Sequence, residues 1–290
     1  MNQYLQIIVL AVIQGLAELL PVSSSAHVIV AEKLMGLDPS APEQTFLLVM
    51  LHTGTMVAVL FYFWKRWKPL LSATVEVKGR PVRYHFIKMI VLATACTGVL
   101  GLGLKIAIEK IVMIKILGHE KGEIEHLFKS LPLISSSLMC VGIFIIVAGM
   151  VKPVSWNVGL TPWSSSLIGI VQGMCLPFRG FSRSGATIST GLLTGVPRAL
   201  AEDFSFALAV VLTPPVIALE LYRLLKAWPS GKSLFDLLLP GCVGMVFSFL
   251  AGLIALRVLS AALEKGRWMY FGFYCIAASI GVFVAAMSGL

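Results

Sequence analysis

The side chains that could do chemistry gather in two short polar segments of a very apolar chain. The second polar segment, GFSRSGAT at residues 180–187, combines Arg183 with three hydroxyl groups and two glycines. An arginine inside hydrocarbon costs about 2.5 to 3.5 kcal/mol on insertion scales, so it is expected to meet an anion or water. The glycines allow close backbone approach, and a helix beginning near Ser184 would point its positive end at the same place. These features predict a buried phosphate site, with a polar helix cap and an outward-reaching Arg183 as the competing interpretation.

The first polar segment, QGLAELLPVSSSAH at residues 14–27, carries a carboxylate. Gln14 and Glu18 are four residues apart and therefore lie on one face of a helix. A buried carboxylate is costly unless it meets a cation or a metal ion. We therefore predict that Glu18 either meets Arg183 or holds a divalent ion against a substrate diphosphate. A purely structural ion pair between these two residues is the alternative.

Three serines and a histidine follow a chain break at Pro21. If a helix starts near Ser23, the side chains of Ser24 and His27 stand one turn apart, within reach of a hydrogen bond. A serine beside a histidine, with Glu18 upstream, is the material for nucleophilic or general acid-base catalysis. Serine clusters also cap helices, so capping alone is an equally strong interpretation.

The second polar segment supplies groups that could hold phosphoryl oxygens. The guanidinium of Arg183 can grip two oxygens with its planar fork of donors. The hydroxyl groups expected to join it on a phosphate belong to Ser23, Ser182, Ser184 and Thr187. The residues expected to support the site are Gln14, Gly180 and Gly185.

Other polar residues are expected to be structural. His52 is a lone histidine within an apolar run, where a packing role is favoured over catalysis, although it could line the cavity. Glu220 and Arg223 lie near a helix end and are expected to pair. The five cysteines show no CxxC spacing and are interpreted as small apolar residues. They are Cys96, Cys140, Cys175, Cys242 and Cys275.

Composition predicts the kind of protein that positions these residues. The chain has 290 residues, of which 58% are hydrophobic and 13% charged, and its mean hydropathy is +0.91. No soluble domain of this size needs so much apolar surface, and the apolar runs are continuous rather than alternating. We predict an all-α polytopic membrane protein. The net charge of +9 is concentrated in particular loops, so it indicates orientation and anionic lipid rather than nucleic acid.

Apolar runs predict about six membrane crossings and two shorter hairpins. Residues 4–20 and 26–35 are each too short to cross, so a re-entrant hairpin is expected over 4–35. The same pattern recurs over 163–200, with its break at Pro177 to Gly180. The expected crossings are 45–64, 88–108, 131–151, 204–224, 235–257 and 268–288.

Loop charges predict the orientation of these crossings. The loop after residue 64 holds seven Lys or Arg residues against Glu76, and is therefore expected to be cytoplasmic. The loop at 109–129 balances acidic and basic residues, as expected for the opposite face, and the next crossing returns the chain to the cytoplasm at 152–153. The N-terminus lacks the basic region of a signal peptide and is expected to be retained.

The chain also contains an internal duplication. Residues 13–16 (IQGL) match 171–174 (VQGM), and Leu-Pro follows in both copies before a serine-rich stretch. We predict one integral-membrane domain with a first repeat of about 1–151 and a second of about 152–290. Three crossings separate the hairpins, so the copies would enter from opposite sides and their breaks would meet near the bilayer midplane.

At these residues the sequence resembles the undecaprenyl-diphosphate phosphatase family, the bacitracin-resistance proteins of bacterial inner membranes. The first family motif is present as residues 14–27 and the second as 180–187, and residues 204–209 (FSFALA) also resemble a family segment. The likeness spans nearly the whole chain. Two long motifs in the right order make it specific.

The resemblance implies an enzyme that hydrolyses undecaprenyl diphosphate to undecaprenyl phosphate and inorganic phosphate, which recycles the lipid carrier of peptidoglycan synthesis and gives bacitracin resistance. It also implies a divalent cation, Mg²⁺ or Ca²⁺, and a site open to the periplasm. In this hypothesis Arg183 binds the terminal phosphate, Glu18 holds the metal or acts as a base, Ser24 is the candidate nucleophile, and His27 exchanges its proton. Direct attack by water is the alternative to a phosphoserine.

Three positions depart from the family pattern. Gln14 takes the alternative that the motif allows and cannot ionise, so any carboxylate role falls to Glu18. Ala26 stands where glycine is common. Pro177 is separated from Gly180 by two residues, where the family usually has proline directly before glycine, so the second break is longer.

Two other function classes compete with the phosphatase. A transporter or flippase for an anionic substrate or lipid phosphate also uses broken helices that meet at the midplane, but it does not require a base beside a hydroxyl. A structural subunit would leave the polar breaks unexplained. The expected partner is a polyprenyl diphosphate lipid in the membrane, and a monomer and a homodimer are both compatible with the sequence.

Overall fold

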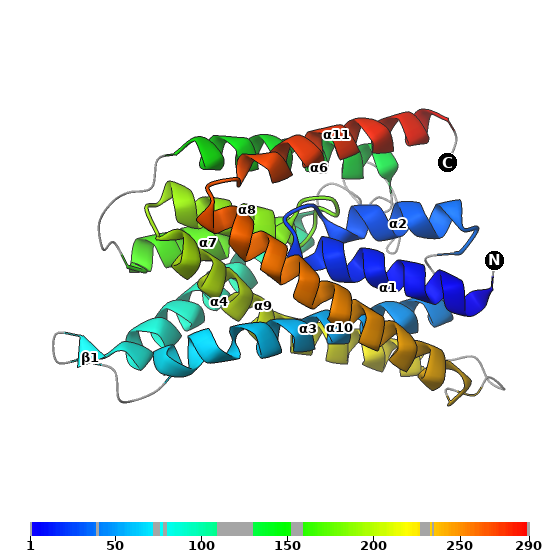
Figure 1. The fold of residues 1–290 in the computed structure, drawn as a ribbon, viewed down its shortest axis with the longest axis horizontal. Coiled ribbons are helices and arrows are strands. Elements are labelled where there is room, and N and C mark those ends of the chain that lie inside the picture. The colour runs from blue at the N-terminus through cyan, green and yellow to red at the C-terminus, as the bar shows by residue number, and fades with distance from the viewer. Residues whose placement is uncertain are drawn as a thin grey trace.

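A computed structural model describes residues 2–38, 41–71, 76–77, 80–108, 130–151, 159–226, 233 and 235–288. These parts of the chain form ten α-helices and one pair of two-residue strands (Figure 1). The helices are α1 (Gln3–Leu19), α2 (Ser24–Leu34), α3 (Pro42–Leu71), α4 (Val82–Ala107), α6 (Leu131–Met150), α7 (Pro162–Cys175), α8 (Arg183–Leu193), α9 (Arg198–Lys226), α10 (Phe235–Glu264) and α11 (Met269–Met287). The antiparallel strands are β1 (Glu76–Val77) and β2 (Arg80–Pro81).

Six helices in the described part of the chain are long and apolar enough to cross a membrane, which confirms the predicted number of about six crossings. They are α3, α4, α6, α9, α10 and α11. The chain is therefore an all-α multi-pass membrane protein. The predicted polar loop at 109–129 and the return at 152–153 lie outside the described residues.

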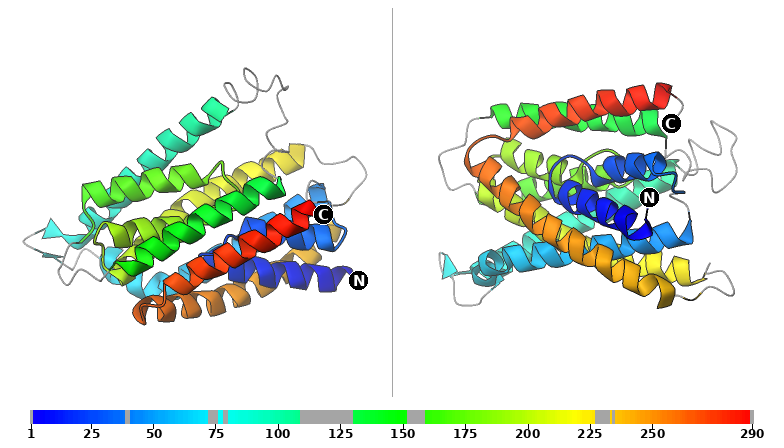
Figure 2. Two further views of the ribbon diagram at one scale, coloured as in Figure 1. Left: turned by 90° about the horizontal axis from the view of Figure 1, so that it is seen from above. Right: turned by 45° about the vertical axis from the view of Figure 1, so that its right-hand side comes forward.

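Two pairs of shorter helices occupy the places of the predicted hairpins. In the first pair α1 and α2 flank a break at residues 20–23, and in the second α7 and α8 flank a break at 176–182. The first pair runs inward from the end of the molecule that holds the N-terminus, and the second runs inward from the opposite end (Figures 1 and 2). Re-entry into a membrane and an inverted repeat stay predictions.

The first helix of each pair packs closely on a long helix from the other half of the chain. α1 lies against α10, and α7 lies against α4. A Cβ on Gly15 of α1 would collide with Ser248, Ala251 and Gly252. A Cβ on Gly173 of α7 would press against Thr97, Leu100 and Gly101 in the same pattern. Each half of the chain thus supplies the long helix on which the first short helix of the other half packs.

The helices α6 and α11 close the bundle over the breaks (Figure 2). The hydroxyl of Ser135 donates to the carbonyl of Ser279 at 2.9 Å, and the hydroxyl of Ser279 donates to the carbonyl of Ser135 at 2.8 Å. Gly142 and Gly272 allow the two backbones to approach closely, as is common where membrane helices pack.

A buried ionic cluster, which the sequence did not reveal, joins α3 to α9. Nη1 of Arg66 donates to Glu202 at 2.9 Å and Nη2 donates to the carbonyl of Ala199 at 3.0 Å, while Nε lies 3.0 Å from Oδ1 of Asp203 in an ion pair. The hydroxyl of Ser260 on α10 donates to Glu202 at 2.6 Å. We call these five residues the Arg66 cluster. It ties the two halves together at the end of the molecule that holds the predicted cytoplasmic loop.

Candidate active site

The two helix breaks meet inside the bundle. The backbone N–H of Gly180 in the second break donates to the hydroxyl of Ser25 at the start of α2, at 3.2 Å. The hydroxyl of Ser184 donates to the carbonyl of Leu20 in the first break at 3.4 Å. Polar groups that a break would otherwise leave unsatisfied therefore satisfy each other across the two halves of the chain.

Each break depends on an unusual backbone conformation. Ser23 has φ 68° and ψ 98°, a region that residues other than glycine rarely adopt. Gly180 has φ 96°, and a Cβ there would collide with the carbonyl of Ile134. The two residues inserted before Gly180 are absorbed in a turn, where the N–H of Phe181 bonds the carbonyl of Phe178 at 3.1 Å. The longer break thus still brings α8 to the first polar segment.

Glu18 and Arg183 face each other across this junction. Nη2 of Arg183 donates to Oε1 of Glu18 at 3.2 Å. The other carboxylate oxygen, Oε2, accepts from the hydroxyl of Ser24 at 2.5 Å and from Nε2 of Gln14 at 3.2 Å. The side chains of Glu18 and Arg183 are 18% and 22% exposed, so a ligand can reach both. The predicted meeting of Glu18 and Arg183 is thus present in the structure.

The guanidinium of Arg183 has donor capacity to spare. Its Nη1 is buried and makes no hydrogen bond with the described residues. Arg183 is also the first residue of α8, and Ser182 caps this helix by accepting from the N–H of Gly185 at 3.2 Å. Arg183 therefore begins a helix whose positive end lies at the break, and its side chain has a donor without a partner among the described residues, two features suited to a phosphoryl group.

The predicted hydrogen bond between Ser24 and His27 was wrong. The hydroxyl of Ser24 points to Glu18 instead. Nδ1 of His27 bonds the carbonyl of Ser23 at 2.7 Å, and Nε2 bonds the hydroxyl of Tyr274 on α11 at 2.7 Å. Both ring nitrogens of His27 are occupied, so Glu18 and not His27 is placed to take a proton from Ser24.

The hydroxyl groups assigned to phosphate binding differ in their surroundings. Ser182 and Ser184 lie beside Arg183, with their hydroxyls 3.4 Å apart. The hydroxyl of Ser23 lies 3.3 Å from that of Ser25. Thr187 is completely buried, and its hydroxyl bonds the carbonyl of Arg183 at 2.8 Å and the hydroxyl of Ser205 at 2.6 Å. Thr187 therefore supports the start of α8 from behind.

Gly185 lets α8 lie close to α6, because a Cβ there would press on Ile145. Tyr274 and Ser205, the partners of His27 and Thr187, were not assigned to the site from the sequence. Tyr274 lies on α11, far along the chain from the polar segments, so no spacing in the sequence links it to them. Ser205 lies on α9, the next helix after α8, within the family-like segment 204–209, and that likeness was the signal that could have found it.

His52 of α3 belongs to the site, although it was expected to have a packing role. Its Nδ1 lies 3.1 Å from Nε2 of Gln14 and 3.8 Å from Oε2 of Glu18. Its side chain is 33% exposed, which does not fit a residue satisfied by packing alone. The sequence did contain a sign of this role. Burying an imidazole in an apolar membrane crossing costs free energy unless it has a polar partner, so a histidine at this position indicates such a partner.

The donor atoms available for a metal ion are few. The described residues contain no group of three or more His, Cys, Asp and Glu side chains that could hold one. Glu18 does supply a carboxylate, with the Gln14 amide and the His52 imidazole beside it. Carboxylate, amide and imidazole groups are all known ligands of divalent ions, so these residues fit such an ion.

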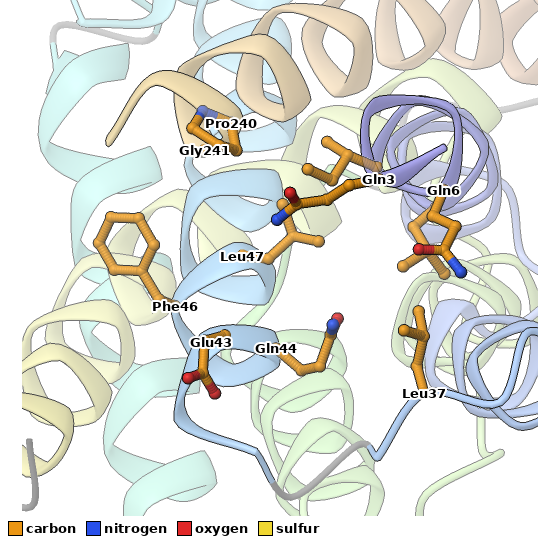
Figure 3. Close-up of a pocket in the computed structure, with 11 residues that line it drawn as sticks. Gln3, Gln6, Leu37, Glu43, Gln44, Phe46, Leu47, Pro240 and Gly241 are labelled. Atoms are coloured by element: carbon orange, nitrogen blue, oxygen red, sulfur yellow. The ribbon is translucent and has the colours of Figure 1, made fainter. Parts of the chain in front are cut away.

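A cavity of about 50 Å³ lies apart from these residues, between the start of α1, the start of α3 and α10 (Figure 3). Its walls combine the side chains of Gln3, Gln6, Glu43 and Gln44 with mostly apolar residues. None of the residues assigned to the site lines it.

Comparison with known proteins identifies the family of the chain. A family model described as bacitracin resistance protein BacA matches residues 7–281. A protein of Acinetobacter baylyi named undecaprenyl-diphosphatase 2 is 55% identical over 280 residues, which cover 95% of each chain. A protein of Desulfosudis oleivorans named undecaprenyl-diphosphatase is 34% identical, over 93% of this chain and 94% of its own.

Proposed function

Because the chain belongs to the bacitracin resistance protein BacA family, we propose that it hydrolyses undecaprenyl diphosphate to undecaprenyl phosphate and inorganic phosphate. The observation that carries this proposal is the contact between Glu18 and Arg183 across the two breaks, beside the hydroxyl of Ser24. A transporter needs the arginine but not a carboxylate bonded to a hydroxyl, so the geometry favours the enzyme.

In this proposal the terminal phosphate binds at the start of α8. The free Nη1 of Arg183 and the N-terminal end of the helix face its oxygens, and the hydroxyls of Ser182, Ser184 and Ser23 surround it. Thr187 keeps the first turn of α8 in place. Phosphoryl transfer depends mainly on positioning and on neutralising charge, and this arrangement provides both.

Glu18 acts as the base. Its Oε2 takes the proton of Ser24, whose oxygen attacks the terminal phosphorus while the bond to the bridging oxygen breaks. Undecaprenyl phosphate leaves with the bridging oxygen. Water then hydrolyses the phosphoserine and releases phosphate. In the alternative route Glu18 takes a proton from water, which attacks phosphorus directly. Detection of a phosphoserine on Ser24 in quenched protein would establish the first route.

His27 has a positioning role in this scheme. Held between the carbonyl of Ser23 and the hydroxyl of Tyr274, the ring fixes the first turn of α2 and so the direction of the Ser24 hydroxyl. Ser23, whose carbonyl His27 bonds, has a strained backbone conformation, and such strain is common at functional sites.

A divalent cation is part of the proposal. Glu18, with the side chain of Gln14, would hold it, and when bound it would supply charge neutralisation to the diphosphate. The site is otherwise complete within one chain, since both breaks come from the same protomer, and a partner copy is not needed for the chemistry.

The membrane arrangement follows from the same proposal. The two helix pairs are re-entrant hairpins of an inverted repeat, and the site opens to the periplasmic side of the bacterial inner membrane. The lipid tail lies among the crossing helices. The released undecaprenyl phosphate returns to cell-wall synthesis, and the activity gives resistance to bacitracin, as the description of the family states.

Release of phosphate from undecaprenyl diphosphate by the purified protein tests this function. We expect release that a chelator abolishes and that Glu18→Gln reduces at least about 100-fold, the usual scale for removal of a general base. Protein that moves lipid or anion across vesicles without releasing phosphate would support the transporter instead.

A further inference from the structure

The cavity between the start of α1, the start of α3 and α10 takes no part in the proposed reaction. We propose that it binds the ammonium headgroup of an aminophospholipid, phosphatidylethanolamine, from the surrounding membrane. This inference goes beyond the proposed function and does not depend on it, because none of the residues assigned to the active site lines the cavity.

The size of the cavity suits a small headgroup. Its volume is about 50 Å³. A buried water molecule needs at least about 10 to 15 Å³ of such space, so the cavity has room for about three or four water molecules. The aminoethyl end of phosphatidylethanolamine has one nitrogen and two carbon atoms beyond its phosphate, and it is therefore a group of the right size.

One polar atom in the wall of the cavity lacks a hydrogen-bond donor. Oε1 of Gln44 is buried and accepts no hydrogen bond in the described part of the chain. Figure 3 shows the side chain of Gln44 pointing into the space that Gln3, Gln6 and Leu37 border. A buried carbonyl oxygen without a donor is unfavourable, so a ligand that donates a hydrogen bond at this place is favoured.

The polar groups of the wall favour a cation over an anion. Among the described residues that line the cavity, Glu43 is the one charged residue, and its charge is negative. The other polar side chains are the amides of Gln3, Gln6 and Gln44, whose carbonyl oxygens accept hydrogen bonds. An ammonium group carries three donors and a positive charge, which match these acceptors, whereas an anionic headgroup would meet no Lys or Arg in the described part of the wall.

The cavity lies at the ends of two helices that are long enough to cross the membrane. The helix α3 begins at Pro42, and its wall residues lie in its first two turns. The apolar span of α10 begins at Leu238, and Pro240 and Gly241 of the wall follow directly. The ends of membrane crossings lie where the hydrocarbon region gives way to lipid headgroups, so a headgroup is the ligand that the membrane presents at this level.

Apolar surface adjoins the cavity on two helices. Leu5 of α1 and Leu239 of α10 are 50% and 64% exposed, and each is next in sequence to a wall residue. Inside the cavity, the buried side chains of Ile7, Leu10 and Leu47 offer contacts to the methylene groups of a headgroup. A lipid whose acyl chains lie along these helices can therefore place its headgroup in the cavity, which distinguishes a lipid from a water-soluble amine.

Lipid binding to the purified, delipidated protein, measured by native mass spectrometry, tests the proposal. Phosphatidylethanolamine, phosphatidylcholine and phosphatidylglycerol with the same acyl chains would be compared. The choline group carries a positive charge but no N–H donor, and the glycerol group carries no positive charge. We expect phosphatidylethanolamine to bind at least about 10-fold more tightly than either of the other lipids, because it alone supplies a charged donor to Gln44.

Gln44→Leu removes the acceptor with little change in the size of the side chain. It should weaken the binding of phosphatidylethanolamine at least about 10-fold and change that of phosphatidylcholine less than about 2-fold. Gln172 of α7 is the matched control, because both polar atoms of its amide are also buried without a partner among the described residues, but it lies outside the cavity wall. Gln172→Leu should bind phosphatidylethanolamine as the wild type does. Circular dichroism would check that both variants fold.

Several results would overturn the proposal. Equal binding of the three lipids, tighter binding of phosphatidylglycerol, or wild-type binding of phosphatidylethanolamine by Gln44→Leu would each do so. If Gln44→Leu does not fold, Gln3→Ala at the exposed start of α1 replaces it, and it should weaken the binding of phosphatidylethanolamine at least about 3-fold. Phosphate release is not the readout, so these results do not depend on whether the proposed hydrolysis is correct.

Discussion

Two partly buried arginines, Arg66 and Arg183, join the halves of the described chain, and they differ in how many of their donor nitrogens have a partner. Arg66 uses Nε for Asp203, Nη1 for Glu202 and Nη2 for the carbonyl of Ala199. Arg183 uses Nη2 for Glu18, while its Nη1 makes no hydrogen bond with the described residues. Every guanidinium nitrogen of Arg66 thus lies within 3.0 Å of an oxygen atom, although Oδ1 of Asp203 accepts no hydrogen bond in the described part of the chain. Nη1 of Arg183 has no such partner among the described residues.

The difference shows how one pairing of residue types can serve two purposes. A buried arginine whose donors all have partners has nothing to offer a ligand, and its carboxylates depend on it for solvation. A buried arginine with an unused donor is costly unless a ligand supplies the acceptor. The Arg66 cluster is thus expected to stabilise the fold, and the Glu18–Arg183 pair to bind substrate.

The largest expected effect is on catalysis. Arg183→Ala should reduce phosphate release from undecaprenyl diphosphate at least about 100-fold, equivalent to about 3 kcal/mol, as when an oxyanion donor is deleted. Its thermal midpoint in detergent should change little, because Glu18 keeps its bonds to Ser24 and Gln14. Arg179→Ala, in the same break, is the control and should stay near wild type. Full turnover by Arg183→Ala would contradict the claim that Arg183, unlike Arg66, binds the substrate.

Arg66→Ala should have the opposite pattern. It leaves Glu202 and Asp203 buried without their cation, and removal of one partner from such a cluster destabilises a protein by about 3 kcal/mol or more. Thermal unfolding in detergent measures this loss. The fraction that remains folded should release phosphate at nearly the wild-type rate. Folded Arg66→Ala protein without activity would show that the Arg66 cluster takes part in the chemistry.

A smaller loss of stability is expected from Ser260→Ala. The variant removes a 2.6 Å hydrogen bond to the buried carboxylate of Glu202, and bonds to charged groups contribute about 1.5 to 3 kcal/mol. The hydroxyl of Tyr62, which donates to Ser260 at 3.0 Å, also loses its acceptor. The thermal midpoint should fall by less than in Arg66→Ala. An unchanged midpoint would mean that Glu202 does not depend on this bond.

The smallest effect on turnover is expected from Tyr274→Phe. This variant tests whether Tyr274 only positions His27 or takes part in the reaction. Removing the hydroxyl frees Nε2 of His27 but leaves Nδ1 bonded to Ser23. Turnover should fall less than about 10-fold, in line with one hydrogen bond of about 1 kcal/mol. Stability should not change measurably, since Tyr274 is half exposed. A loss as large as that of Arg183→Ala would place Tyr274 in the reaction itself.

Much of the fold could be predicted because apolar run length and chain breaks determine where helices cross and stop. The breaks after α1 and α7 were located from Pro21 and Pro177, and the six crossings from hydropathy. The start of α9 was placed too late, at residue 204 rather than Arg198. Glu202 and Asp203 lower the local hydropathy there, and only the fold shows that Arg66 pairs with them.

The part of the site that could be predicted is the part formed by charged side chains, because a charged group in an apolar segment needs a partner. Glu18 and Arg183 are expensive separately, so their meeting follows from the sequence. The direction of His27 did not follow, because one-turn spacing brings Ser24 near but does not reveal that Tyr274 holds the ring. His52 was undervalued for the same reason, since its partner Gln14 lies on another helix. Contacts between distant elements are set by packing, which spacing does not encode.

A double-mutant cycle on phosphate release is the most direct test of the central claim, that Glu18 and Arg183 serve one diphosphate. The rates of Glu18→Gln, Arg183→Gln and the double variant would be compared with wild type, using purified protein and undecaprenyl diphosphate. We expect the rate of phosphate release to fall at least about 100-fold in each single variant. The double variant should be only slightly slower than the slower of the two single variants, because the effects of groups that act together are not additive. Losses that multiply, or a single variant with full turnover, would contradict the shared site.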